Sequence, residues 1–161
     1  MLKVGMRAAA QGMRVADVMT SDVVFLRTQE TLDEAWQILH DRGISGAPVL
    51  SSAGRLVGIA SKADLADPRH RAHDVIGTVR TVRDVMTRVV YAVRANDSLL
   101  GAIQLMIDED IHRAIVVADD GSVVGIVTPM DVLRALVRGE DVTGSVEADQ
   151  AMAFVDVRHL S

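Results

Sequence analysis

Residues 57–64 read Val-Gly-Ile-Ala-Ser-Lys-Ala-Asp, and residues 124–131 read Val-Gly-Ile-Val-Thr-Pro-Met-Asp. The two stretches lie 67 residues apart (124 − 57 = 67), and the same offset aligns residues 15–65 with residues 82–132 without a gap. Within this alignment 19 of 51 positions are identical, including Asp-Val-Met-Thr in both copies. The chain therefore contains an internal duplication, and both copies are expected to fold as the same unit.

Each copy shows the same order of hydrophobic patterns. In the first copy, residues 23–26 form a short apolar run, and residues 32–39 carry apolar side chains at helical spacing. Two further apolar runs, 47–50 and 56–60, are separated by small residues typical of a hairpin turn. The pattern predicts a β-α-β-β-α unit in each copy and an α+β fold overall. Trp36 and the methionines at helical spacing are expected in the core.

The second helix of each copy is predicted to begin at a Ser/Thr-x-x-Asp motif. These motifs are Ser61 to Asp64 and Thr128 to Asp131. A Ser or Thr at the N-cap accepts a hydrogen bond from a helix N–H, and an acid three residues later suits the helix dipole. Pro129 fits the first helical position, and Gly139 is predicted to stop the helix.

The repeats divide the chain into five segments. We predict an N-terminal tail over 1–13, a first repeat over 14–66, a connector over 67–80, a second repeat over 81–138 and a C-terminal tail over 139–161. The apolar residues 151–157 of the last segment could pair as a strand or cover an interface.

The composition excludes several classes of function. The formal net charge is −5, which argues against broad binding of a nucleic-acid backbone. The chain has no cysteine, so disulfides, thiol catalysis and thiolate metal sites are ruled out. No apolar run approaches the roughly 20 residues of a membrane helix, and we expect a soluble, cytoplasmic protein.

The order of the motifs resembles a CBS domain, named after cystathionine beta-synthase. The residues that carry the resemblance are Asp-Val-Met-Thr, Gly-Ile-Ser-Gly-Ala-Pro-Val and Val-Gly-Ile-Ala-Ser-Lys-Ala-Asp-Leu in the first copy, and their counterparts in the second. The resemblance covers Val15 to Leu136. It implies a stand-alone tandem pair related by a pseudo-twofold axis, with two clefts that hold adenine nucleotides.

The resemblance also implies which residues form each cleft. One ligand site would use Thr128, Asp131, Met19, Thr20, Val24 and Ile44. The other would use Ser61, Asp64, Met86, Thr87, Tyr91 and Ile111. His112 and Arg113 stand where similar pairs place basic residues that reach phosphates. The ligand implied is AMP, ADP, ATP or S-adenosylmethionine, acting as a regulator, and no cofactor is required.

Elementary chemistry agrees with such a ligand. An ionised Asp accepts charge-assisted hydrogen bonds from both hydroxyls of a ribose, and a helix N-terminus attracts phosphate. The alternative is structural, because Ser/Thr-x-x-Asp is also a common helix cap that needs no ligand.

We therefore predict a regulatory module that senses an adenosyl ligand and is not an enzyme. The family habit implies a homodimer, and the regulated target would be another protein or a nucleic acid. A ligand-independent dimerisation module is the main alternative. A nucleic-acid-binding regulator, using Arg69, Arg71 and Arg80, is a second. No metal site is predicted, although His70 and His73 have a His-x-x-His spacing that could combine with His40 or His159.

Overall fold

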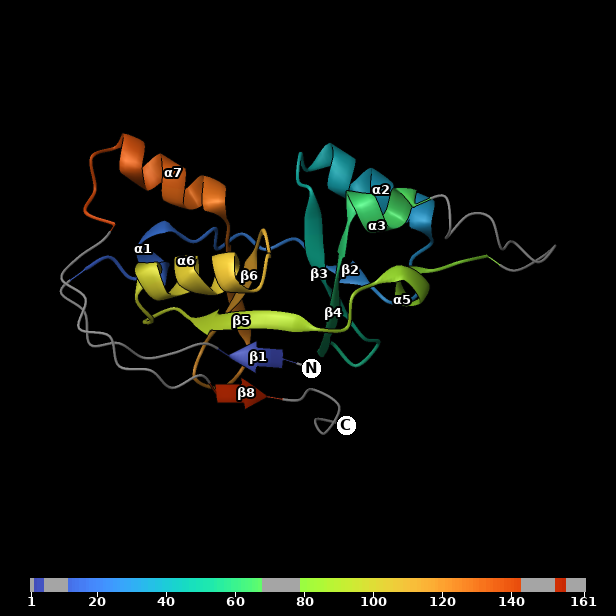
Figure 1. Ribbon diagram of the computed structural model, residues 1–161. Coiled ribbons are helices and arrows are strands. Elements are labelled where there is room, and N and C mark those ends of the chain that lie inside the picture. Colours follow the sequence, from blue (N-terminus) through green and yellow to red (C-terminus); the bar gives the residue numbers. More distant parts are fainter. Residues whose placement is uncertain (1, 5–11, 68–78, 143–152, 156–161) are drawn as a thin grey trace. The chain divides into compact units, whose positions relative to one another are not determined.

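The computed structural model of the protein describes residues 2–4, 12–67, 79–142 and 153–155 (Figure 1). The chain forms two compact units. Unit 2 is Val24–Val89, and unit 1 combines Met1–Val23 with Val90–Ser161. Most of the predicted connector, with Arg69, His70, Arg71 and His73, lies outside the described residues, as does His159.

Unit 2 is built on a three-stranded sheet in the order β2-β3-β4. Strand β2 runs parallel to β3, and β3 runs antiparallel to β4. The elements of this unit are β2 (Leu26–Arg27), α2 (Leu32–Asp41), β3 (Gly46–Leu50), β4 (Leu56–Ser61), α3 (Lys62–Ala66) and α5 (Val82–Val85). The predicted β-α-β-β-α order of the first repeat is confirmed, although its first strand is shorter and later than residues 23–26.

Unit 1 repeats this plan and enlarges the sheet to five strands in the order β7-β6-β5-β1-β8. Strand β8 pairs antiparallel with β1, which itself runs parallel to β5 (Figure 1). The elements are β1 (Leu2–Val4), α1 (Val15–Val18), β5 (Val90–Arg94), α6 (Leu99–Asp108), β6 (Ala114–Val117), β7 (Val123–Val127), α7 (Pro129–Val137) and β8 (Ala153–Val155). The α+β fold of two β-α-β-β-α repeats is therefore confirmed.

The short helices α1 and α5 are exchanged between the repeats. Helix α1 comes at the start of the first repeat in the sequence but packs in unit 1 with the second, and α5 comes at the start of the second repeat but packs in unit 2 with the first. In unit 1, the Val15 N–H donates to the Asp97 carbonyl at 3.0 Å. In unit 2, the Val82 N–H donates to the Glu30 carbonyl at 2.9 Å. Both valines are fully buried in the cores of these units. Each unit therefore needs a helix that carries the Asp-Val-Met-Thr motif of the other copy.

The two cores consist mainly of small and medium aliphatic side chains, as expected from the scarcity of aromatic residues. The prediction for Trp36 is wrong, because its side chain is 37% exposed. Leu32, Ala35 and Leu39 form the buried stripe of α2, and Trp36 falls at its edge. There the ring lies under the Lys62 ammonium, with 5.9 Å between the nitrogen and the ring centroid.

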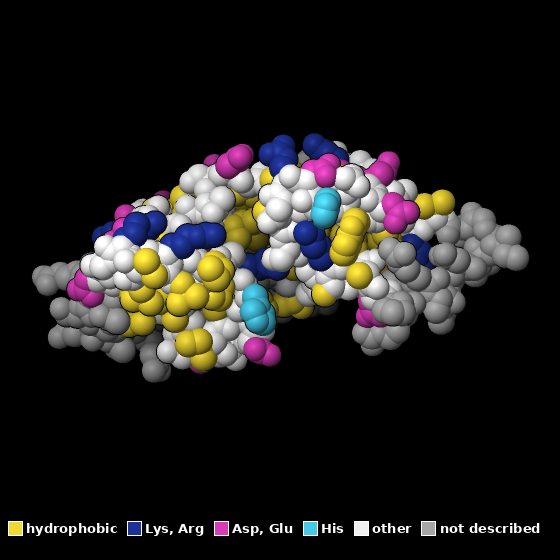
Figure 2. Space-filling view, turned by 90° about the horizontal axis from the view of Figure 1, so that it is seen from above, with side chains coloured by type: hydrophobic (Ala, Val, Ile, Leu, Met, Phe, Trp, Pro, Cys, Tyr) yellow, Lys and Arg dark blue, Asp and Glu magenta, His cyan; other side chains and the backbone are white. Residues whose placement is uncertain are grey.

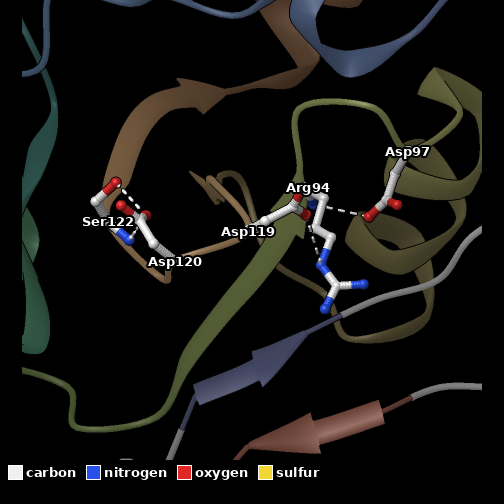
Figure 3. A network of polar contacts seen from close by, with 5 residues as sticks. All are labelled: Arg94, Asp97, Asp119, Asp120 and Ser122. Carbon is white, nitrogen blue, oxygen red and sulfur yellow. Dashed lines mark hydrogen bonds and ion pairs between the residues drawn. The ribbon is translucent and has the colours of Figure 1, made fainter.

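A polar network fixes the turns at one end of the unit 1 sheet (Figure 3). The Arg94 N–H donates to the buried Asp97 carboxylate at 2.7 Å, and the Arg94 guanidinium lies 3.9 Å from Asp119. Asp120 accepts hydrogen bonds from the hydroxyl and the N–H of Ser122, and these bonds lower the pKa of Asp120. The hairpin turn predicted between the last two strands of this repeat is confirmed.

Candidate functional site

The Thr128 motif of unit 1 lies where β7 passes into α7. Thr128 is the N-cap residue, and Pro129 occupies the first turn, as predicted. The Asp131 Oδ2 atom accepts hydrogen bonds from the Thr128 N–H at 2.9 Å and from its hydroxyl at 2.7 Å. Asp131 is only 6% exposed, one of two buried polar or charged residues among those described. A buried carboxylate requires such partners, because burial otherwise penalises its charge.

The other oxygen of the same carboxylate has a different partner. The Arg134 Nη1 atom donates to Asp131 Oδ1 at 3.0 Å, from one turn further along α7. The Asp131 side chain is 7% exposed, whereas the Arg134 side chain is 62% exposed. The sequence interpretation missed Arg134, although an Asp and an Arg three residues apart on a helix are expected to meet.

Two predicted site residues from the first copy lie beside this motif within unit 1. Thr20 and Ile126 exchange backbone hydrogen bonds of 2.9 and 3.0 Å, two residues before Thr128. Met19 packs on the same strand, so that a Cβ atom added at Gly125 would lie 2.6 Å from the Met19 sulfur. Met19 and Thr20 therefore lie beside the Thr128 motif within unit 1.

The Ser61 motif of unit 2 has the equivalent surroundings. Asp64 Oδ2 accepts hydrogen bonds from the Ser61 N–H at 2.8 Å and from its hydroxyl at 2.6 Å, and the Asp64 N–H donates back to Ser61 Oγ at 3.2 Å. Thr87 and Ile59 exchange backbone hydrogen bonds of 2.9 Å each, and Met86 packs against Gly58. Met86 and Thr87 therefore lie beside Ser61 and Asp64, as the duplication requires.

A third copy of the same capping geometry serves as an internal reference. Asp84 Oδ2 accepts hydrogen bonds from the Thr81 N–H at 2.8 Å and from its hydroxyl at 3.1 Å, at the start of α5. Asp84 is exposed, whereas Asp131 is buried. Capping geometry therefore does not by itself identify a ligand site, and the burial of Asp131 is what sets it apart.

The remaining predicted residues are distributed over the two units. Val24 and Ile44 belong to unit 2, and both are half-buried. In unit 1, Tyr91 and Ile111 are half-buried, as is Arg113, whereas His112 is exposed. The Tyr91 hydroxyl donates to the Glu109 carboxylate at 2.5 Å, a contact that the sequence did not indicate. The predicted clefts, which combine residues of both units, stay predictions.

Exposed apolar side chains gather on α7. The exposed fractions are 53% for Met130, 50% for Leu133, 50% for Leu136 and 89% for Val137. Hydrophobic side chains are conspicuous on this side of unit 1 in Figure 2. Several large apolar residues on one helix face are typical of a surface that a partner covers.

No helix within 12–67 or 79–142 is long and apolar enough to cross a membrane. In the same parts of the chain, no three His, Asp or Glu side chains lie close enough together to hold a metal ion.

The amino-acid sequence matches the CBS domain family twice, over residues 15–69 and 82–138. The protein MJ1426 of Methanocaldococcus jannaschii is 30% identical over 155 residues, which cover 78% of this chain and 92% of that protein. Other curated relatives are longer. The chain spans 39% of a second protein of this organism and 24% of its inosine-5'-monophosphate dehydrogenase.

Solved structures of CBS pairs share the fold. The structure of CBSX2 in complex with AMP is 30% identical with a TM-score of 0.68, covering 79% of this chain and 98% of that one. CBSX2 comes from Arabidopsis thaliana. The CBS domain pair of protein MJ0100, in complex with 5'-methylthioadenosine and S-adenosyl-L-methionine, is 26% identical with a TM-score of 0.69, covering 80% and 99%.

Proposed function

Because this chain belongs to the CBS domain family, we propose that it is a regulatory module that binds an adenosyl ligand and catalyses no reaction. The observation that carries the proposal is the buried Asp131 carboxylate beside Met19 and Thr20, in a fold shared with CBS pairs solved with AMP and S-adenosylmethionine. A buried, ionised acceptor at a helix N-terminus suits the hydroxyl groups of a ribose.

The proposal includes two ligand sites, one for each Ser/Thr-x-x-Asp motif. The first site uses Thr128, Asp131, Met19, Thr20, Val24 and Ile44, and the second uses Ser61, Asp64, Met86, Thr87, Tyr91 and Ile111. His112 and Arg113 would contact phosphate. The ligand is AMP, ADP, ATP or S-adenosylmethionine, all of which are present in the cytoplasm, where we place the protein. Binding would change the orientation of the repeats, provided that the two arrangements differ in ligand affinity.

Isothermal titration calorimetry with AMP, ADP, ATP and S-adenosylmethionine tests this function. Asp131→Ala should weaken the binding of the tightest ligand at least tenfold, because a hydrogen bond to a charged group contributes about 1.5–3 kcal/mol. Asp84→Ala is the matched control, since it removes the same capping arrangement from α5. It should leave the affinity within about twofold of the wild type.

The outcome that contradicts the proposal is the absence of saturable binding by the folded wild-type protein to any of these ligands. Equal loss of affinity in Asp131→Ala and Asp84→Ala would instead contradict the assignment of Asp131 to the site. Both variants should be checked by circular dichroism, so that a loss of folding is not counted as a loss of binding.

The main alternative is a dimerisation module that needs no ligand, and the exposed apolar side chains of α7 favour it. We propose that these side chains cover one another in a homodimer, which is compatible with either function. Leu133→Glu should shift the mass measured by light scattering from dimer to monomer. Ile107→Glu is the control, because Ile107 is 67% exposed but lies on α6. A monomeric wild-type protein would contradict the dimer.

A further inference from the structure

We propose that Arg134 is a positioning residue that makes the Thr128 site selective for an intact ribose. The inference rests on the proposed function, since it concerns how Asp131 would hold the sugar of the ligand. It is based on the different hydrogen-bond partners of the two Asp131 carboxylate oxygens, Thr128 for Oδ2 and Arg134 for Oδ1. It is also based on the different lengths of α3 and α7.

Asp131 can accept a further hydrogen bond at one of its two carboxylate oxygens. Its Oδ2 atom already accepts two hydrogen bonds from Thr128, at 2.9 and 2.7 Å. Its Oδ1 atom accepts one hydrogen bond from Arg134, at 3.0 Å. Because an ionised carboxylate offers about four lone-pair sites, the remaining acceptor capacity is at Oδ1. A ribose hydroxyl that binds Asp131 would therefore meet the atom that Arg134 contacts.

The Arg134 guanidinium orients the Asp131 carboxylate and compensates its charge. An arginine side chain is always charged and donates hydrogen bonds in a fixed planar fork. Its hydrogen bond to Oδ1 and the two that Thr128 donates to Oδ2 together fix the orientation of the carboxylate, and its charge compensates that of a 7% exposed side chain. The Arg134 side chain itself is 62% exposed. Asp131 is thereby held in an orientation in which it can accept a further hydrogen bond.

The first repeat differs from the second at the position equivalent to Arg134. The offset of 67 places Asp67 at the position of Arg134. Helix α3 ends at Ala66, and Asp67 has a ψ angle of 119°, which is outside the helical range. Helix α7 continues to Val137, so Arg134 stays on the same helical face as Asp131. Position 67 therefore supplies neither an arginine nor a helical position equivalent to that of Arg134.

The Thr128 site should discriminate strongly between a ribonucleotide and its 2'-deoxy analogue, because loss of one hydroxyl leaves a buried charged acceptor short of a partner. This discrimination should depend on Arg134, although Arg134 need not contact the ligand itself.

Calorimetric titration with AMP and 2'-deoxy-AMP tests the inference on the full chain. The Asp64→Ala background is measured in parallel to reduce binding at the Ser61 site. The wild type should prefer AMP about tenfold or more, and Arg134→Ala should weaken AMP binding about five- to tenfold while changing 2'-deoxy-AMP binding less than about twofold. Arg134→Lys keeps the charge and should recover AMP binding to within about threefold of the wild type.

Arg138→Ala is the matched control variant. Arg138 is the C-cap residue of the same helix, and its side chain pairs with Glu140 at 2.7 Å. Arg138→Ala therefore removes one positive charge, as Arg134→Ala does, but at a position one turn further along the chain. It should leave the preference for AMP over 2'-deoxy-AMP within about twofold of the wild-type value. The same comparison with adenosine and 2'-deoxyadenosine tests the preference for ribose in the case that the site does not accept a 5'-phosphate.

The outcomes separate the inference from the function on which it rests. If the wild type binds AMP and Arg134→Ala keeps the full preference for AMP, or loses both nucleotides equally, the role of Arg134 is overturned while the sensor function stands. If the wild type binds neither AMP nor adenosine, the proposed function fails, and the inference fails with it. A preference for ribose that is lost in Arg134→Ala and retained in Arg138→Ala supports the inference.

Discussion

The two units share one backbone framework and differ in the helix that follows their sheets. In unit 1, Thr20 pairs with Ile126, and in unit 2, Thr87 pairs with Ile59, with nearly the same hydrogen-bond lengths. The helix that follows the last strand of each repeat has nine residues in unit 1 (α7) but five in unit 2 (α3). The duplication has thus preserved the main-chain pairing, while the surroundings of the acidic residue have diverged.

The physical reason for this difference lies in what each feature must satisfy. A buried backbone N–H or C=O that loses its partner destabilises the fold, so the pairing of the short helices with the sheets is tightly constrained. The exposed turns of α3 and α7 carry no such requirement. Arg134 and the apolar side chains of α7 could therefore arise in one repeat without a counterpart in the other.

The largest expected effect tests whether the shared framework is equally important in both units. Val15→Ala and Val82→Ala should each lower the free energy of unfolding by about 2–3 kcal/mol, because each removes two methyl groups from a fully buried site. Urea denaturation measures the loss, and hydrogen exchange locates it. If Val15→Ala reduced protection in unit 2 rather than unit 1, the packing of α1 described above would be wrong.

The two units should respond differently to a methyl group added at Gly58 or at Gly125, where the backbone lies close to neighbouring atoms. A Cβ atom at Gly58 would lie 2.8 Å from the Thr87 carbonyl, whereas at Gly125 the nearest atom, at 2.6 Å, is the flexible Met19 sulfur. Gly58→Ala should therefore destabilise the protein by about 2 kcal/mol, and Gly125→Ala by less.

A rescue experiment sharpens the same prediction. Met19→Ala should compensate part of the cost of Gly125→Ala, because it removes the atom that the new methyl group meets. Met86→Ala should not restore Gly58→Ala, since the backbone carbonyl of Thr87 remains in place. Equal rescue in both units, measured by urea denaturation, would be evidence against this difference.

A third, smaller effect belongs to unit 2 alone. The Lys62 ammonium lies over the ring of Trp36, whereas the equivalent positions of the second repeat, 129 and 103, hold Pro and Ile. A double-mutant cycle with Lys62→Met and Trp36→Leu should give a coupling free energy of about 0.5 kcal/mol. Trp36 is the single tryptophan, so its fluorescence should also change in Lys62→Met. A coupling indistinguishable from zero would show that the two side chains only lie near each other.

The smallest expected effect is a pH dependence of the free energy of unfolding that comes from the start of α2 and not from the start of α6. Hydrogen bonds from the Thr31 N–H and then from its hydroxyl hold the pKa of Glu34 below its ordinary value of 4.5. A carboxyl whose pKa is lowered by folding stabilises the protein above that ordinary value and loses this contribution as the pH falls through the lowered pKa.

Chemical denaturation between pH 7 and pH 3 measures this dependence. The difference in stability between the wild type and Glu34→Gln should shrink as the pH falls. Ser98→Ala is the control, because its partner at the start of α6 is the Gly101 N–H, which does not titrate. A constant difference for Glu34→Gln over this range would mean that the carboxylate charge contributes nothing there.

Much of the fold follows from the repeated hydrophobic pattern. The hairpins, the helix starts at Ser61 and Thr128 and the stop at Gly139 were all predictable, because each depends on residues close together in the sequence. The exchange of α1 and α5 was not, since it depends on contacts such as that of Val15 with Asp97. Four-residue helices carry too little periodicity to be recognised.

The candidate site was predictable only in part. The family resemblance named both acidic residues and placed Met19 and Thr20 near Thr128, a grouping that is present within unit 1. Spacing did not reveal that Asp131 is buried while Asp84 is exposed, because burial depends on the tertiary surroundings. The spacing of Asp131 and Arg134 did contain the signal for their ion pair.

The reciprocal docking of the short helices also bears on how the chain folds during its synthesis. A ribosome releases the residues of α1 early, but their hydrogen-bond partner Asp97 and core neighbour Leu99 follow some 80 residues later. Unit 2 is complete once Val89 has emerged, since it includes α5. Unit 2 can therefore fold first, while the buried face of α1 stays uncovered until the second repeat has been made.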